Sequence, residues 1–320
     1  MNKFAASMVA LVGAMVAATP AIAFPEQPIV VNSCQPAGGG NDRNLQALVP
    51  FAEQALNVPL ISQYRPGAGG TLAFQEMAGM QKDGHMLVLC DQGGAIFGPI
   101  VQNIDFGPDG AIPIARLSLV PWVVTAHSST PFTTLEELFE YVRKEPGKLR
   151  ISIADVGSAD HYTWLSLMKR ANLPLTDVRW LPYGGGAPKV RAMLAGEAQV
   201  DMLLVPLIRD AIKDGTVRIL AVAAPERLAD LPDVPTLTEL GIDISDGLVT
   251  GLWAPPGTPQ ERVDTLRAGV AKIKDLPEYQ KIYQQLGQDI NQFLPGDQYQ
   301  AEWDKTWSEA RDLLQSVIAQ

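Results

Sequence analysis

A cysteine and a run of glycines follow the first predicted strand, in the segment VVNSCQPAGGGNDRNLQ at residues 30–46. Glycine lets backbone N–H groups approach a ligand closely, and a helix start adds unpaired donors and partial positive charge. Such a turn can hold a phosphate or a carboxylate. Cys34, at the end of the strand, could instead act as a nucleophile. This segment alone therefore leaves phosphate binding, carboxylate binding and covalent catalysis open.

Three further loops of this kind follow predicted strands: YRPGAGGT from residue 64, DQGGA from residue 91 and ADVGSADH from residue 154. In open α/β sheets, ligands lie beyond the carboxyl ends of the strands, where such loops converge. Several helix N-termini together could hold a carboxylate without lysine or arginine. For each single loop the alternative is a tight turn, with Asp42 and Ser158 as simple helix caps.

The sequence lacks the fingerprints of common enzymes and metal sites. GGGND does not match GxGxxG, and neither GxxxxGK[ST] nor GxSxG occurs. The two cysteines and three histidines show no metal-ligand spacing, so we expect no metal and no cofactor. Cys34 and His161 could form a nucleophile and base, but only their coexistence supports that pair. The sequence thus favours a binding protein over an enzyme.

The first 23 residues have the pattern of a secretory signal peptide, with one lysine, an apolar stretch over 5–18 and Ala-Ile-Ala at 21–23. The apolar stretch is shorter than the roughly 20 residues that span a membrane. We therefore expect cleavage before Phe24 and a periplasmic mature chain. In that oxidising compartment Cys34 and Cys90 can pair.

Composition indicates a two-domain globular protein. The chain has 320 residues, of which 47% are hydrophobic and 19% charged, and this suits a large buried core. A formal net charge of −10 argues against nucleic acid as a partner. It leaves an anionic small ligand possible, because salt screens charges more than about 8–10 Å away.

Strand and helix patterns alternate through residues 29–91 and again within 125–248, which predicts parallel sheets flanked by helices. Extended apolar runs at 117–126 and 248–254 bracket the second set. We expect two α/β lobes joined by two crossing strands, with 24–124 and 249–320 in lobe 1 and 125–248 in lobe 2. Lobes joined in this way can close around a ligand like a hinge.

Several stretches occur in the order found in one family of binding proteins: PAGGGND, RPGAGG, VGSADH, LPYGGGAPKVRAMLAGEAQVD, LPDVPTLTELG and APPGTPQERVDTL. In these stretches the chain resembles the Bug-type (TctC-like) solute-binding proteins of tripartite tricarboxylate transporters. The resemblance implies a two-lobed type II periplasmic binding protein, or Venus flytrap, with a doubly wound sheet in each lobe. It also implies capture of a small organic carboxylate and delivery to membrane permease subunits. We expect a monomer.

The resemblance implies a ligand site in the cleft between the lobes. Family members grip one carboxylate through two ordered waters, the first two glycine loops and a helix N-terminus of the second lobe. Carried onto this chain, those positions are Ala37, Gly38, Gly39, Asn41, Asp42, Ala68, Gly69, Gly157, Ser158 and Ala159. Neighbouring positions complete the expected site: Cys34, Gln35, Gln92, Gly93, Val156, His161, Tyr183 and Asp201.

The chain departs from the family at three places. Cys34-Gln35 stands where a proline and an aromatic residue are usual, and Asp91-Gln92 stands where threonine or serine is usual. After Asp201 the chain continues with MLLVPLIRD in place of a polar stretch. We therefore expect the carboxylate grip to be retained and the part of the pocket that selects the ligand's other end to be altered, so the ligand is not named.

Three alternatives stay open. The protein could present its ligand to a sensor kinase, or it could be an exported enzyme that uses Cys34. The strand order 2-1-3 would place the strands of Cys34 and Cys90 side by side, about 4.8 Å apart, which permits a disulfide. Two buried free thiols are the other possibility for these cysteines.

Overall fold

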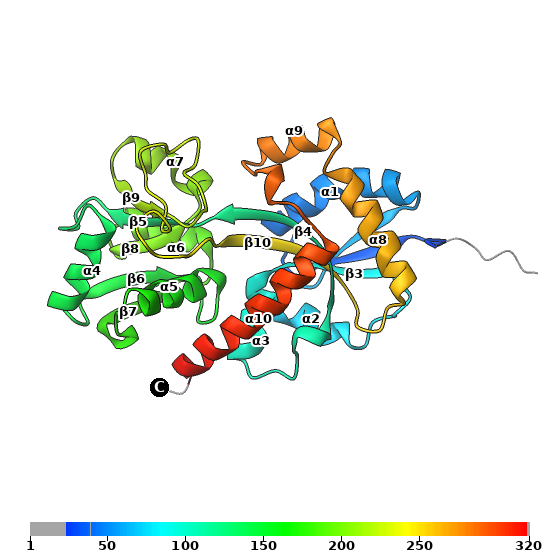
Figure 1. Ribbon diagram of the computed structural model, residues 1–320, viewed down its shortest axis with the longest axis horizontal. Helices are drawn as coiled ribbons and strands as arrows, with labels where there is room; N and C mark the ends of the chain where they lie inside the picture. The colour runs from blue at the N-terminus through cyan, green and yellow to red at the C-terminus, as the bar shows by residue number, and fades with distance from the viewer. Residues whose placement is uncertain (1–23, 39, 319–320) are drawn as a thin grey trace, which may run out of the picture.

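The computed structural model describes residues 24–38 and 40–318, with side chains up to 315. The expected signal peptide, residues 1–23, and Gly39 of the expected site lie outside the described residues. Within the described part the chain forms two α/β lobes, as Figure 1 shows. No helix of this part is long and apolar enough to cross a membrane.

Lobe 1 is built on a six-stranded sheet in the order β11-β4-β10-β3-β1-β2. Its strands are β1 (Ile29–Ser33), β2 (Leu60–Tyr64), β3 (Met86–Asp91), β4 (Ile112–Pro121), β10 (Gly247–Ala254) and β11 (Leu294–Pro295). Strand β1 pairs in parallel with both β2 and β3, so the order 2-1-3 predicted for these strands is confirmed. Strand β10 is antiparallel to β3 and to β4.

Helices cover both faces of this sheet. They are α1 (Gly40–Leu56), η1 (Ala68–Gly70), α2 (Thr71–Met77), the π-helix η2 (Gly93–Phe97), α3 (Gly98–Val101), η3 (Pro108–Gly110), α8 (Gln260–Ile273), α9 (Pro277–Gln285), η5 (Ile290–Gln292) and α10 (Gly296–Ile318). Alternate residues of β3 point to opposite faces: Leu87 and Leu89 join the core under α1 and α8, whereas Val88 and Cys90 join the core under α2 and α10. An apolar strand of this kind suits a sheet covered on both faces.

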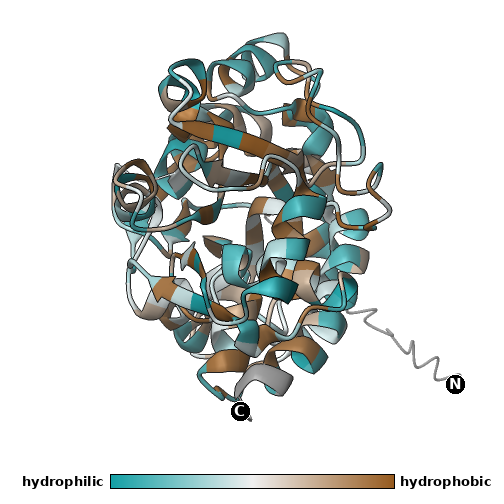
Figure 2. Ribbon diagram, turned by 90° about the vertical axis from the view of Figure 1, so that its left-hand side faces the viewer, coloured by the Kyte–Doolittle hydropathy of each residue, from teal (hydrophilic) through white to brown (hydrophobic). Residues whose placement is uncertain are grey.

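Lobe 2 has a five-stranded sheet in the order β7-β6-β8-β5-β9. Its strands are β5 (Val123–His127), β6 (Leu149–Ile153), β7 (Val178–Pro182), β8 (Val200–Leu203) and β9 (Val217–Val222). Its helices are α4 (Leu135–Lys144), α5 (Ala159–Arg170), η4 (Leu175–Asp177), α6 (Gly186–Leu194) and α7 (Val205–Lys213). Figure 2 shows largely hydrophobic residues along the strands, whereas the outer helices carry both hydrophobic and hydrophilic residues.

Two extended segments connect the lobes. Strand β4 ends at Pro121 and β5 begins at Val123, so the chain changes sheets at Trp122, and it returns to lobe 1 at the start of β10. The expected boundaries after residues 124 and 248 fall inside β5 and β10. At the first crossing the strand pattern runs from β4 into β5 almost without a break, so it does not mark where the pairing partner changes. The two-lobed α/β fold itself is confirmed.

Candidate functional site

Cys34 and Cys90 form a disulfide at the carboxyl ends of β1 and β3, with their Cα atoms 5.2 Å apart. Both cysteines are 0% exposed. Of the two possibilities left open for these cysteines, the structure therefore has the disulfide. A disulfide-bonded Cys34 has no thiolate, which removes the hypothesis of a cysteine nucleophile. Contact between Cys34 and a ligand stays a prediction.

Two glycine loops rest directly on this disulfide. A Cβ atom on Gly70 would lie 2.9 Å from Cys90 Sγ and 3.0 Å from Cys34 Sγ, and one on Gly94 would lie 2.8 Å from Cys90 Sγ. Only glycine allows such close contact between backbone and sulfur. The disulfide thus holds the turns after β1, β2 and β3 together at one edge of the sheet.

The loop before α1 is organised by Asp42. Its carboxylate accepts hydrogen bonds from Gly38 N at 2.7 Å and from the Tyr64 hydroxyl at 2.7 Å. The bond from the Gly38 backbone, followed by that from Tyr64, lowers the pKa of Asp42. Ala37 and Gly38 are exposed above it, as are Ala68 and Gly69 in the neighbouring loop. Asp42 therefore shapes the loop, while the backbone of the loop faces solvent.

Asn41 and Asp91 lie beside the disulfide. Asn41 Nδ2 donates to Asp91 Oδ2 at 3.1 Å, and Asn41 Oδ1 accepts from Thr250 Oγ1 at 3.2 Å. Asp91 Oδ1 accepts from Gly94 N at 3.2 Å. Burial raises the pKa of Asp91 against the lowering effect of these donors. Asp91 was recognised as a departure from the family but was not among the expected site residues; its place at the end of β3 was the signal available.

In lobe 2 the loop of residues 154–158 leads into α5. Ser158 Oγ lies 2.6 Å from both Asp155 O and Asp160 Oδ1, so its proton is used within the loop. The Ser158 hydroxyl is therefore already bonded within its own loop. The first N–H groups of a helix have no partner within the helix. Those of α5, beginning at Ala159, are therefore the donors that this loop can offer.

A buried ion cluster lies under the start of α5. Lys189 Nζ is 2.6 Å from Asp160 Oδ2 and 2.8 Å from Asp201 Oδ1, and all three side chains are at most 3% exposed. Burial raises the pKa of Asp160 but the Lys189 ammonium outweighs it, so this pKa falls. Burial dominates at Asp201 and raises its pKa to about 7. One ammonium thus serves two carboxylates, and Asp160 also accepts from Ala154 N at 2.8 Å, which fixes the loop.

Three of the expected site residues have buried side chains in this structure. Asp201 is 0% exposed in the ion cluster. His161 is 2% exposed, its Nδ1 accepts from Gly157 N at 3.1 Å, and burial lowers its pKa to about 4. Gln92 is 4% exposed, with Nε2 3.5 Å from Glu302. Asp201 and His161 thus have partners within lobe 2, whereas Gln92 borders a cavity next to α10. Tyr183 is half-buried and donates to Glu197 at 3.3 Å.

The two lobes meet at the remaining expected residues. A Cβ atom on Gly93 would lie 3.7 Å from Ala159 N, and one on Gly157 would lie 2.5 Å from Val101 Cγ2. Gly93 and Val101 belong to lobe 1, and the other two residues to lobe 2. Val156, on the same loop, has an exposed fraction of 54%. The α5 N-terminus therefore faces the glycine loop that follows β3.

A small cavity of about 80 Å³ lies beside this region, between the start of α1 and α7. Its lining includes Arg43 and Asn44 of lobe 1 and Leu204, Pro206 and Leu207 of lobe 2. The last three belong to the MLLVPLIRD segment, where the chain departs from the family. Arg43 was not among the expected site residues, although its place in the first turn of α1 was a signal.

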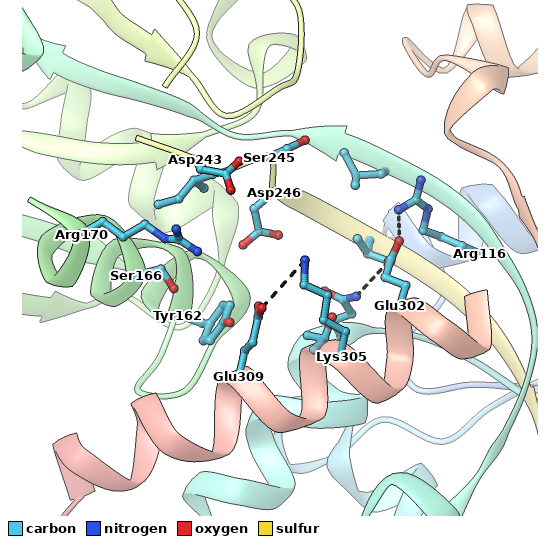
Figure 3. Close-up of a pocket in the computed structure, with 15 residues that line it drawn as sticks. Arg116, Tyr162, Ser166, Arg170, Asp243, Ser245, Asp246, Glu302, Lys305 and Glu309 are labelled. Carbon is cyan, nitrogen blue, oxygen red and sulfur yellow. Dashed lines mark hydrogen bonds and ion pairs between the residues drawn. The ribbon is translucent and has the colours of Figure 1, made fainter. Parts of the chain in front are cut away.

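A larger cavity of about 280 Å³ lies on the α10 side of the crossing strands. Figure 3 shows the carboxylates of Asp246, Glu302 and Glu309 around it, with Glu302 paired to Arg116. Lys305 and Arg170 also line it. Four carboxylates, Asp243 included, make it a poor receptor for an anion, and of the glycine loops only Gln92 reaches it. The converging backbone donors instead favour the Gly93–Ala159 region as the candidate site.

Residues 46–306 match the model of the tripartite tricarboxylate transporter family receptor, TctC. The chain belongs to this family. The family and its fold are those of solute-binding proteins and not of enzymes. Among curated relatives, a UPF0065 protein of Bordetella pertussis is 30% identical over 278 residues, which cover 85% of this chain and 84% of the relative. Protein BugT of the same organism is 26% identical over 246 residues, 73% of this chain and 72% of BugT.

Solved TctC-type structures share the fold. A TctC solute-binding protein from Polaromonas, determined without ligand, has a TM-score of 0.78 at 25% identity and covers 92% of this chain and 100% of its own. MatC from Rhodopseudomonas palustris, determined with bound malate, has a TM-score of 0.73 at 26% identity. The match covers 91% of this chain and 100% of the MatC chain. Both agree with the two-lobed architecture of this family member.

Proposed function

We propose that this protein captures a small organic carboxylate between its lobes and delivers it to the membrane subunits of a tripartite tricarboxylate transporter. One observation carries the proposal: the N-terminus of α5 faces Gly93 across the lobe boundary. A Cβ atom added to Gly93 would lie 3.7 Å from Ala159 N. Helix N-termini and glycine-rich turns bind anions through backbone N–H groups. Malate bound to MatC, a protein of the same fold, supports the proposal that the ligand is a carboxylate.

The proposed ligand contacts come from both lobes. Lobe 1 supplies the backbone at Gln35, Ala37, Gly38, Ala68, Gly69 and Gly93, with Asn41 and Asp42 fixing the first loop. Lobe 2 supplies Val156, Gly157, the Ser158 and Ala159 backbone, and Tyr183 at the rim. Ordered water between these groups and a carboxylate can be nearly as favourable as a direct bond.

Replacing Ala159 with proline tests the grip. Ala159 is the first residue of α5, a position where proline is well tolerated, and Ser158 before it is extended at φ −70° and ψ 164°, as proline requires. Ala159→Pro removes one N–H and leaves the helix intact. We expect calorimetry to show carboxylate binding weakened by about 1.5–3 kcal/mol, the scale of a hydrogen bond to a charged group.

The matched control is Gln260→Pro, at the exposed first position of α8, which is remote from the cleft. Its carboxylate affinity should equal that of the unaltered protein. Equal affinity in Ala159→Pro would rule out this helix end as the carboxylate site. Failure of every carboxylate in a thermal-shift screen would contradict the function as a whole.

We further propose that the protein acts in the periplasm as a monomer, after removal of residues 1–23. Mass spectrometry of the exported protein should find Phe24 as the first residue, because Ala21 and Ala23 form the small-residue cleavage pattern. A mature chain that retains residues 1–23 would contradict this part of the proposal.

A further inference from the structure

Asp91 is a carboxylate placed inside a site for carboxylates. It ends β3 next to the disulfide and accepts hydrogen bonds from Gly94 N at 3.2 Å and from Asn41 Nδ2 at 3.1 Å. Gln35 adds a further side-chain donor. These donors favour the ionised carboxylate, which accepts at every oxygen, whereas burial acts against it and raises the pKa of Asp91.

No lysine, arginine or histidine within residues 24–38 and 40–315 forms an ion pair with Asp91. Two acidic groups of the neighbouring loops have other partners. Asp160 forms an ion pair with Lys189, and Asp42 accepts hydrogen bonds from Gly38 N and the Tyr64 hydroxyl. Asn41, which orients Asp91, is itself fixed by Thr250. The Asp91 carboxylate is thus fixed by hydrogen bonds and partly exposed, and no positively charged side chain of the described residues pairs with it.

The same small space is bordered by Asp91 and by the N-terminus of α5. A Cβ atom placed on Gly93 would lie 2.8 Å from Asp91 Oδ1 and 3.7 Å from Ala159 N. A ligand carboxylate held by α5 would therefore be close to a second carboxylate, in a region where little solvent screens the repulsion. A positive group on the ligand, next to its carboxylate, would turn this repulsion into attraction.

We propose that the ligand is an amino carboxylate whose ammonium group pairs with Asp91 while its carboxylate is held by the α5 N-terminus and the glycine loops. This inference rests on the proposed function and adds the ligand's chemical class. An ammonium offers three donors and no acceptor, which matches an ionised carboxylate. The adjacent placement of the two charges in an amino acid matches the adjacent placement of Asp91 and the helix end.

Calorimetry with matched ligand pairs tests the inference. The pairs are aspartate with succinate, glutamate with glutarate, and alanine with propionate, each at pH 7. In the unaltered protein the amino member of at least one pair should bind about 30-fold more tightly or better, the scale of a buried charge pair. Asp91→Asn keeps the shape of the side chain but removes its charge. It should abolish this preference by weakening the binding of the amino member of the pair.

Asp243→Asn is the control, because it removes an exposed carboxylate in the larger cavity on the α10 side and should leave both members unchanged. Equal or tighter binding of the members without the amino group, in the unaltered protein, overturns the inference and leaves the proposed function standing. So does a preference that survives Asp91→Asn.

If the amino-free member binds better as the pH falls from 8 to 5, and Asp91→Asn removes this effect, Asp91 acts as a protonated donor and the inference is also overturned. If no member of any pair binds, both the inference and the proposed function fall.

Discussion

Lys189 is the residue on which the loop before α5 depends. Its ammonium pairs with Asp160 and Asp201 and also donates to Met202 O at 3.0 Å, while Asp160 anchors the loop through Ala154 N and Ser158. Removing one member of a buried ion cluster leaves the others uncompensated, which costs far more than losing an exposed pair. Lys189 therefore acts on the site by positioning, at a distance from any ligand.

Lys189→Met should lower the free energy of unfolding by about 3–5 kcal/mol, because two buried carboxylates lose their cation. Urea denaturation measures this. Lys144→Met is the matched control, since Lys144 forms an exposed pair with Glu140 at 2.9 Å, and such pairs contribute about 0.3–0.5 kcal/mol. A loss below about 1 kcal/mol in Lys189→Met would show that the cluster is not essential to lobe 2.

Among the elements, β1 and β3 form the base of the site, and the disulfide between them fixes three loops at once. The bond closes a segment with a sequence separation of 56 residues. Closing such a segment restricts the unfolded chain, and this stabilises the folded protein. The glycines at 70 and 94 have room only for backbone beside the sulfur atoms.

Cys34→Ala with Cys90→Ala should reduce the free energy of unfolding by about 4 kcal/mol, the value expected from chain entropy for a segment of this length. Denaturation of the unaltered protein with a reductant should give a similar loss, whereas the double variant should not respond to the reductant. Two free thiols in the denatured, unreduced protein would contradict the bond and the prediction together.

At the scale of the whole molecule, two crossings join lobes that also touch through α5 and η2. Contacts from both lobes to one ligand favour the closed arrangement. Small-angle scattering should therefore give a smaller radius of gyration with saturating ligand than without it. Ala159→Pro should show a smaller change at the same ligand concentration. An identical radius in both states would argue against closure without arguing against binding.

The junction between the lobes also contains a pH-sensitive group. Asp246 accepts from Thr163 Oγ1 at 2.6 Å and from Gly247 N at 2.7 Å, and burial, reinforced by Glu302 and Glu309, raises its pKa from 3.8 to about 6. The folded protein thus binds more protons than the unfolded chain between about pH 4 and 6. The contribution of this group to stability is fully present below pH 4 and is lost as the pH rises through 6.

Asp246→Asn should therefore raise the melting temperature at pH 7.5 relative to the unaltered protein and leave it nearly unchanged at pH 3, below the pKa of the unfolded carboxyl. Thermal denaturation across this range measures the difference, with the exposed Asp243→Asn as the control that should follow the unaltered protein at both values. A constant offset between Asp246→Asn and the unaltered protein at all pH values would show that Asp246 does not titrate in this window.

The two-lobed α/β fold, the glycine loops at the strand ends and the family could all be predicted from the amino-acid sequence. These follow from local patterns: apolar periodicity places strands and helices, and glycine runs mark the turns. The predicted order of strands permitted a disulfide, since Cys34 follows β1, Cys90 lies near the end of β3 and these strands are neighbours, but the choice between a disulfide and two free thiols came from the structure.

Which polar side chains are accessible depends on how the whole chain packs. Asp201 lies within β8 and His161 in the first turn of α5, and both are buried in lobe 2, whereas Gln92, which follows β3, borders the cavity on the α10 side. The buried Lys189 pairs with two carboxylates, and one of them, Asp160, is 29 residues away in the sequence. No local pattern predicts that pairing. The direction of a side chain and its counter-charge depend on which segments, distant in sequence, pack around it, and that is why the place of Asp91 beside the α5 N-terminus became visible only in the folded chain.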